Sequence, residues 1–306
     1  MPLDDAALYR QMLRIRRFEE TVLERFSEGL FYGTTHTSIG QEADAVGVLS
    51  CLEPGDVVVS NHRCHGHFLA YGGPMEGLAA ELMGRASGVC GGRGGSQHIV
   101  WRDFYSNGVL GGTLPVAAGM ALAEKRGRTG QLVVAFLGDG ALGEGAVYES
   151  LNLASLWSLP MLYVLENNRY AQTTPIECHL AGDPAARFGA FGIPFDVIET
   201  TDVLEIRRLA LAALGEIRAG RGPRALVIGT YRLAPHSKGD DVRDPAEIEG
   251  YRQRDPLPLQ AARLSAVERA AIDRQVEEEV DSAIRRAAAS PEPDPAHLPP
   301  ALDGNA

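Results

Sequence analysis

Three stretches of the chain carry apolar residues every three or four positions, which is the spacing of one face of an α-helix, and a capping pattern marks the start of a fourth helix. Gly29 can end the first of these stretches, and Asp202 can cap the start of the third. Ser265 and Glu268 form a capping-box pattern ahead of the fourth. The pattern therefore predicts helices over about residues 5–28, 144–157, 202–218 and 265–288.

Short, continuous apolar runs alternate with these helices in the middle of the chain. Such runs, when turn residues bound them, are typical of strands that are buried on both faces. They cover Leu132–Leu137, Met161–Leu165 and Ala225–Thr230. Because strands and helices alternate, we expect an α/β fold, a mainly parallel sheet with helices on both faces.

Two other stretches lack a clear period and predict loops. Residues from about 30 to 110 are rich in glycine and histidine, and residues 232–258 are polar and contain proline. We expect one α/β domain over residues 1–258 and a helical extension over 259–290. Residues 291–306 have no periodicity and predict a disordered tail.

Composition narrows the classes of function. The chain has 306 residues and a formal net charge of −11, which disfavours binding to nucleic acid or to an anionic membrane through bulk charge. The sequence contains no apolar run of membrane-spanning length and no signal-peptide pattern at its N-terminus. The four cysteines form no CxxC pair, so we expect reduced thiols and a cytoplasmic protein.

Polar residues follow two of the predicted strands directly. Asp139 lies between two glycines after the first strand, and Asn167 and Asn168 follow the second. Because parallel strands end at the same edge of a sheet, Asp139 and Asn168 are expected to face one crevice. Carboxylate and amide oxygens suit Mg²⁺, and the helix expected to begin near Leu142 points its amides toward the same place. The crevice is therefore predicted to hold a metal-bound polyphosphate.

Each of these features has a plainer interpretation. A Gly-Asp-Gly turn is common, and only its combination with the asparagine pair at the end of a second strand is informative. His62, His65 and His67 could be zinc ligands, although Arg63 among them would repel a cation. The glycine-rich run 88–95 could be a flexible linker, but predicted core on both sides favours a packed loop.

The metal motif and five further motifs resemble those of the α subunit of the thiamine-diphosphate-dependent 2-oxoacid dehydrogenase first component. This family includes pyruvate, branched-chain and acetoin types. The resemblance covers roughly residues 5–250. It rests on residues 39–43 (IGQEA), 61–67 (NHRCHGH), 91–98 (GGRGGSQH), 107–111 (NGVLG), 138–140 (GDG) with 167–170 (NNRY), and 231–237 (YRLAPHS).

The resemblance implies a role for particular residues. Metal binding is implied for Asp139, Asn168 and the backbone carbonyl of Tyr170. Other implied cofactor contacts come from His62, which stands where the family has tyrosine, and from Arg63, Gly108, Leu110, Gly140, Ala141 and His236. Among these, Arg63 and His236 would contact the diphosphate. His65 and His236 are implied to be catalytic residues on the substrate and acyl-transfer side.

The resemblance also implies cofactors and partners. These are thiamine diphosphate, Mg²⁺, a β subunit in an assembly of two α and two β chains, and a lipoyl-bearing acyltransferase. The implied reaction is oxidative decarboxylation of a 2-oxo acid such as pyruvate or a branched-chain 2-oxo acid. Alternatives are an acetoin dehydrogenase α subunit, one half of a split transketolase and a non-catalytic paralogue. A nucleotide-binding module is disfavoured because neither GxxxxGK[ST] nor GxGxxG occurs.

Overall fold

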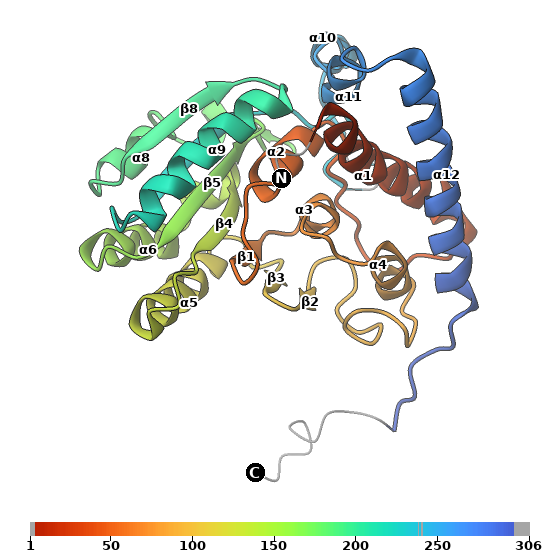
Figure 1. Ribbon diagram of the computed structural model, residues 1–306, viewed down its shortest axis with the longest axis horizontal. Coiled ribbons are helices and arrows are strands. Elements are labelled where there is room, and N and C mark those ends of the chain that lie inside the picture. Colours follow the sequence, from red (N-terminus) through yellow and green to blue (C-terminus); the bar gives the residue numbers. More distant parts are fainter. Residues whose placement is uncertain (1–3, 238, 240, 297–306) are drawn as a thin grey trace.

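The computed structural model describes residues 4–237, 239 and 241–296, and within these ranges seven strands form one sheet (Figure 1). They lie in the order β2-β3-β1-β4-β5-β9-β8, and only β2 pairs antiparallel to its neighbour. Their bounds are Val57–Ser60 for β1, Val100–Trp101 for β2, Phe104–Ser106 for β3, Val133–Gly138 for β4, Met161–Asn167 for β5, Phe195–Glu199 for β8 and Arg224–Gly229 for β9. The predicted α/β class with a mainly parallel sheet is confirmed.

The three predicted strands are confirmed as β4, β5 and β9. They are adjacent and parallel, and Gly138 pairs with Glu166 while Asn167 pairs with Gly229. The carboxyl ends of these strands therefore lie side by side. Strand β8 escaped prediction because its residues alternate between exposed and half-buried at the edge of the sheet, so it has no continuous apolar run.

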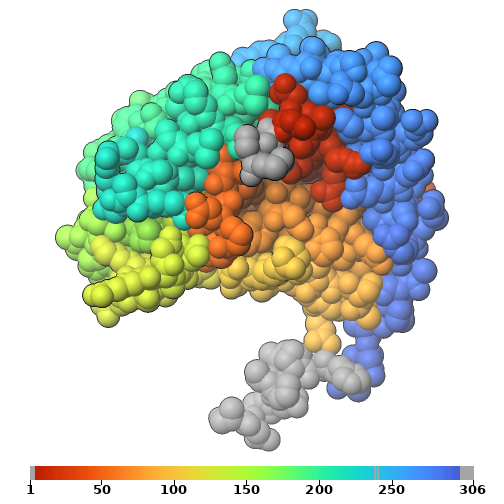
Figure 2. All heavy atoms as spheres, in the orientation of Figure 1, coloured from red at the N-terminus to blue at the C-terminus, as the bar shows by residue number. Residues whose placement is uncertain are grey.

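Apolar layers cover both faces of the sheet. Alternate β4 side chains such as Val133 and Ala135 pack toward helices α5 (Thr113–Gly127) and α6 (Gly145–Leu156). The β4 side chains on the other face of the sheet, such as Phe136, pack toward α2 (Glu42–Leu49) and α9 (Val203–Arg218). This second cluster continues into α1 (Asp5–Arg25), α3 (Cys64–Ala70), α4 (Met75–Leu82) and α12 (Ala266–Ala289). Figures 1 and 2 show α12 along one side of the molecule, next to α1.

The predicted helices and their end signals are confirmed. Helix α1 continues into a 3₁₀ turn, η1 (Phe26–Glu28), which ends at Gly29 in the left-handed conformation (φ 73°). Asp202 caps α9 by accepting a hydrogen bond from the Leu204 amide at 2.9 Å. Ser265 and Glu268 form both hydrogen bonds of a capping box at the start of α12.

Most of residues 30–110 lie outside helices and strands, as predicted, but the prediction missed the helices α2, α3 and α4 within them. Every residue of α2 is buried, so this helix has no polar face and no amphipathic period. The predicted loop 232–258 also contains α10 (Pro245–Arg252) and the first half of α11 (Pro256–Ala261). Both are short, and each begins at a proline that follows a capping aspartate.

The C-terminal part of the chain packs on the same core. Val276, Val280 and Ile284 of α12 are buried in the cluster that contains α1, and the predicted domain boundary at 258/259 falls inside α11. Residues 291–296 contain no helix or strand, and the remainder of the predicted disordered tail, 297–306, lies outside the described residues. Of the helices in the described ranges, none combines the length and the apolar character that crossing a bilayer requires.

Candidate active site

A cavity of about 390 Å³ lies at the carboxyl ends of β4 and β5, where the sequence placed its crevice. Loops that precede α2 and α3 and follow β3 and β9 complete its wall. The cavity is lined by all the residues predicted to bind cofactor or metal: His62, Arg63, Gly108, Leu110, Asp139, Gly140, Ala141, Asn168, Tyr170 and His236. The topology thus brings together residues that are up to 174 positions apart in the chain, from His62 to His236.

Asp139 and Asn168 provide oxygen donors at the strand ends. The Asp139 side chain is almost fully buried, its Oδ2 atom has no hydrogen-bond partner, and His179 Nε2 lies 3.4 Å from that atom. Burial raises the pKa of Asp139, and the nearby His179 partly offsets the effect. A divalent cation would compensate this buried carboxylate, so the donor set fits Mg²⁺.

The Asn168–Tyr170 segment is held in a tight turn. Asn168 Oδ1 accepts a hydrogen bond from the Tyr170 amide at 3.1 Å, and Arg169 between them is left-handed (φ 68°). The Tyr170 hydroxyl donates to Glu247 of α10, at 2.8 Å from Oε2. Both ends of Tyr170 are therefore fixed, which holds its backbone carbonyl beside the strand ends.

Small residues line the floor of the cavity after β4. A Cβ atom added at Gly140 would lie 3.0 Å from the Ala171 Cβ, so a larger residue would crowd the segment after Tyr170. The predicted helix start near Leu142 needs correction. The chain forms a 3₁₀ turn, η2 (Asp139–Gly143), and α6 begins only at Gly145.

A cluster of basic groups lines another part of the wall. Arg63 is buried, donates a hydrogen bond from Nη1 to the Thr37 carbonyl, and places Nη2 at 3.5 Å from His236 Nδ1. Burial, together with the nearby Arg232 charge, lowers the pKa of Arg63 to about 9. This wall therefore holds a buried positive charge at a cost in desolvation, and a bound diphosphate would offset that cost.

His36 and Gln97 also line the cavity and were not identified from the sequence. Gln97 Nε2 lies 3.2 Å from His36 Nδ1, and the His36 ring contacts those of His62 and His236. Gln97 belongs to a quoted motif, and His36 precedes another by only a few residues. Proximity to these motifs was the available signal, since neither residue follows a predicted strand.

His65 lies outside the cavity. It is fully buried on α3, with Nδ1 3.0 Å from Glu19 Oε2 and Nε2 2.9 Å from Ser96 Oγ. This position does not support direct contact between His65 and a substrate. His67 is also buried, and its Nε2 atom lies 3.1 Å from Glu166 Oε1. The alternative interpretation of His62, His65 and His67 as zinc ligands is therefore wrong.

The loop that carries His236 is tied to the metal side of the cavity. Arg243 donates hydrogen bonds to the carbonyls of Arg232 and Ala234, at 2.7 and 2.8 Å, and its guanidinium lies over the Tyr231 ring. The Tyr231 hydroxyl donates to Glu247 at 2.8 Å. Glu247 thus accepts from both Tyr170 and Tyr231, and joins the two halves of the site.

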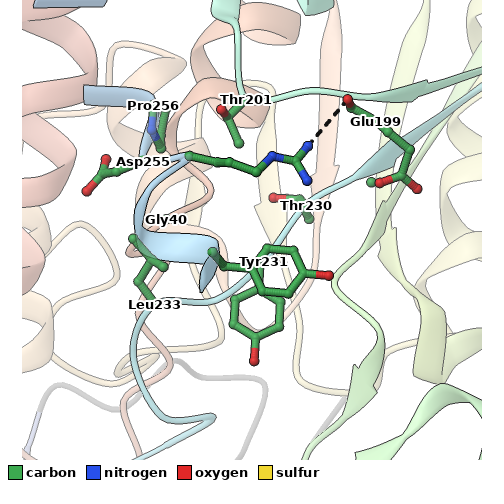
Figure 3. A pocket seen from close by; sticks show the side chains of 11 residues that line it. Gly40, Glu199, Thr201, Thr230, Tyr231, Leu233, Asp255 and Pro256 are labelled. Carbon is green, nitrogen blue, oxygen red and sulfur yellow. Dashed lines mark hydrogen bonds between the residues drawn. The ribbon is translucent and has the colours of Figure 1, made fainter. Parts of the chain in front are cut away.

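A smaller cavity lies behind this loop and is drawn in Figure 3. Its volume of about 10 Å³ leaves room for one water molecule at most, so it is no ligand site. It reflects close packing of Gly40 (φ 96°) under Tyr231, whose carbonyl would lie 2.6 Å from a Cβ at that position. The Tyr231 ring stacks on Tyr251 at 3.8 Å between centroids.

The sequence is similar along almost its whole length to known dehydrogenase subunits. The α subunit of the pyruvate dehydrogenase E1 component from Zymomonas mobilis is 41% identical over 298 residues, which cover 93% of this chain and 84% of that protein. The corresponding subunit from Rhizobium meliloti is 38% identical, over 96% of this chain and 88% of that protein. The α subunit of acetoin:2,6-dichlorophenolindophenol oxidoreductase from Bacillus subtilis is 36% identical, over 95% and 91%.

These relatives are α subunits of the family that the six motifs resemble, so the predicted resemblance is confirmed. The sequence model of one protein family matches residues 10–296. This range includes the helices and strands that build the cavity. With the cavity, the motifs that line it and the full-length matches in agreement, this chain belongs to the dehydrogenase E1 component family.

Proposed function

We propose that this chain is the α subunit of a thiamine-diphosphate-dependent 2-oxoacid dehydrogenase. The observation that carries the proposal is the division of one cavity into two parts. One part contains the buried carboxylate of Asp139, whose Oδ2 atom has no hydrogen-bond partner. The other part contains the buried Arg63 cation. A metal-bound diphosphate has the complementary charges for both.

On the metal side, the Asp139 and Asn168 side chains and the Tyr170 carbonyl would hold Mg²⁺. On the basic side, Arg63 and His236 would donate hydrogen bonds to the diphosphate, with His62 beside them. Gly140 and Ala141 would lie against the phosphates, where side chains larger than methyl would obstruct them. Backbone groups of Gly108 and Leu110 would contact the aminopyrimidine ring.

When bound, thiamine diphosphate supplies the nucleophilic carbon and the electron sink for decarboxylation of a 2-oxo acid. The chain would bind and orient that cofactor, and His236, which lines the cavity, would serve substrate and acyl transfer. Among the described residues that line the cavity, Asp139 is the only carboxylate, and the metal would occupy it. A carboxylate that assists proton removal from the cofactor must then come from another chain, which supports a β subunit.

The assembly we propose contains two α and two β chains and passes its acyl group to a lipoyl-bearing acyltransferase. The substrate is a 2-oxo acid such as pyruvate or a branched-chain 2-oxo acid. Acetoin oxidation is a second candidate, because one of the similar proteins is an acetoin oxidoreductase α subunit that matches over 91% of its length.

The test is to purify the chain with its β subunit and to measure thiamine diphosphate binding by calorimetry with Mg²⁺ present. Three activities are then compared in the presence of an artificial electron acceptor. They are decarboxylation of pyruvate, decarboxylation of branched-chain 2-oxo acids, and cleavage of acetoin. We expect cofactor binding and turnover of one of these substrates. A complex that binds no cofactor, or one that acts only on sugar phosphates as a transketolase does, contradicts the proposal.

A further inference from the structure

Three histidines from separate segments meet on the wall of the cavity. His36 precedes α2, His62 lies between β1 and α3, and His236 follows β9. Their ring centroids are 4.6 Å apart for His36 and His62, 4.7 Å for His36 and His236, and 5.3 Å for His62 and His236. One ring nitrogen from each lies within 4.8 Å of the other two.

His62 is the unusual member of this cluster. Both of its ring nitrogens are buried, and neither has a hydrogen-bond partner. Burial lowers the pKa of His62 well below its usual range, and the charge of Arg63 adds to this effect, so the imidazole is neutral at pH 7. A neutral imidazole with an unused lone pair is the form of histidine that binds metals.

The other two imidazoles have contacts that orient them. Gln97 Nε2 lies 3.2 Å from His36 Nδ1, and Arg63 Nη2 lies 3.5 Å from His236 Nδ1. Both contacts come from N–H donors, so Nδ1 of each ring accepts, and metal binding requires Gln97 to turn its amide oxygen toward His36 and Arg63 to release His236. Three imidazoles that border a cavity leave a further coordination position open to that cavity.

We propose that His36, His62 and His236 form a binding site for a borderline divalent cation such as Zn²⁺, distinct from the proposed Mg²⁺ site. The two sites differ in donor chemistry, since Asp139 and Asn168 offer oxygen whereas the cluster offers only nitrogen. Mg²⁺ prefers the first set, and Zn²⁺, Co²⁺ and Ni²⁺ bind well to imidazole.

Binding requires a small contraction of the cluster. With metal–nitrogen bonds of about 2.0 Å, tetrahedral ligand nitrogens lie about 3.3 Å apart. The separations of up to 4.8 Å must therefore shorten, which side-chain rotation in His62 and His236 can provide because both are in loops. The neighbouring Arg63 charge opposes the cation, so this site binds more weakly than a structural zinc site.

The test uses Co²⁺ as a spectroscopic probe on the purified assembly that contains the full chain. Thiamine diphosphate is omitted because His236 is also a proposed diphosphate contact, and excess Mg²⁺ fills the oxygen site. We expect one Co²⁺ per chain, with visible d–d absorption of the strength that low-coordinate nitrogen ligation gives, and displacement by Zn²⁺. This binding is measured without cofactor or turnover, so its outcome is independent of the proposed function.

The deciding variant is His62→Tyr, because tyrosine is the residue that the family has at this position. Loss of one ligand should weaken Co²⁺ binding by about a hundredfold. His36→Phe should do the same, whereas His98→Phe, which removes an exposed histidine outside the cluster, should leave binding unchanged. Circular dichroism and thermal unfolding establish that each variant is folded.

Three results would overturn the proposal. One is the absence of a Co²⁺ spectrum in the folded parent protein. Another is equal Co²⁺ affinity in the parent and in folded His62→Tyr and His36→Phe. The third is a Co²⁺ signal that Asp139→Ala abolishes, which would assign the ion to the oxygen site.

Discussion

Replacing Asp139 by asparagine should change stability and cofactor binding in opposite directions. The side chain is 1% exposed, and the charge of its carboxylate is poorly compensated without a cation. Asparagine has the same shape and no charge, so it keeps the packing and removes the desolvation cost. We expect the cofactor-free protein to gain about 1–2 kcal/mol in unfolding free energy at pH 7.

The sign of this effect follows from the pKa of Asp139, which burial raises in the folded protein. An acid with a raised folded pKa destabilises the folded state once the pH exceeds its pKa in the unfolded chain, about 3.9. The full destabilisation is present once the pH exceeds the pKa of Asp139 in the folded protein. The advantage of Asp139→Asn should therefore be largest near pH 7 and disappear as the pH falls toward 4.

Cofactor binding should respond in the other direction. Loss of the anionic metal ligand should lower thiamine diphosphate affinity in Mg²⁺ by about a hundredfold, or about 2.7 kcal/mol. Thermal unfolding without cofactor and calorimetric titration with it measure the two effects on one preparation. Glu149→Gln is the matched control, because it removes the same charge from an exposed position on α6. Unchanged cofactor affinity in Asp139→Asn would refute the metal assignment, and an unchanged or lower stability at pH 7 would refute the argument from burial.

Two further substitutions test the support of the site. Glu247→Gln weakens the acceptor shared by the Tyr170 and Tyr231 hydroxyls, so we expect about 1 kcal/mol less unfolding free energy in urea and several-fold weaker cofactor binding by calorimetry. Equal cofactor affinity would show that Glu247 does not couple the two halves of the site. Gly40→Ala places a Cβ at 2.6 Å from the Tyr231 carbonyl in a left-handed conformation, and should cost about 3 kcal/mol in urea unfolding. Gly29→Ala has the same backbone strain without a clash and should cost only about 1 kcal/mol, so equal losses at the two positions would contradict the close-packing argument.

The central part of the fold was predictable because its strands are buried on both faces. In β4 and β5 this burial requires unbroken apolar runs, and the polar residues that follow them mark the ends of the strands. The same reasoning fails for α2, whose burial on all sides removes the polar face that reveals a helix. It also fails for β8, where an exposed edge position interrupts the apolar pattern.

The residues of the candidate site also fall into two groups, those that the sequence pattern could place and those that it could not. Asp139 and Asn168 could be placed from strand ends alone, because the topology of a parallel sheet fixes where those ends lie. Arg63 and His236 could not, since the loops that carry them have no period, and only the family motifs connected them with the cavity. The contact between Glu247 and the two tyrosines depends on how α10 packs, which no local pattern encodes.

The different positions of Arg63 and His65 show what a motif leaves undetermined. Both belong to one short motif, yet Arg63 precedes α3 and turns toward His236, whereas His65 is within the helix and faces α1. There His65 contacts Glu19, which also accepts hydrogen bonds from the Ser38 amide and hydroxyl. The pair therefore anchors the segment that follows His36. An effect of replacing His65 on catalysis would pass through that segment, so it should be accompanied by a loss of stability.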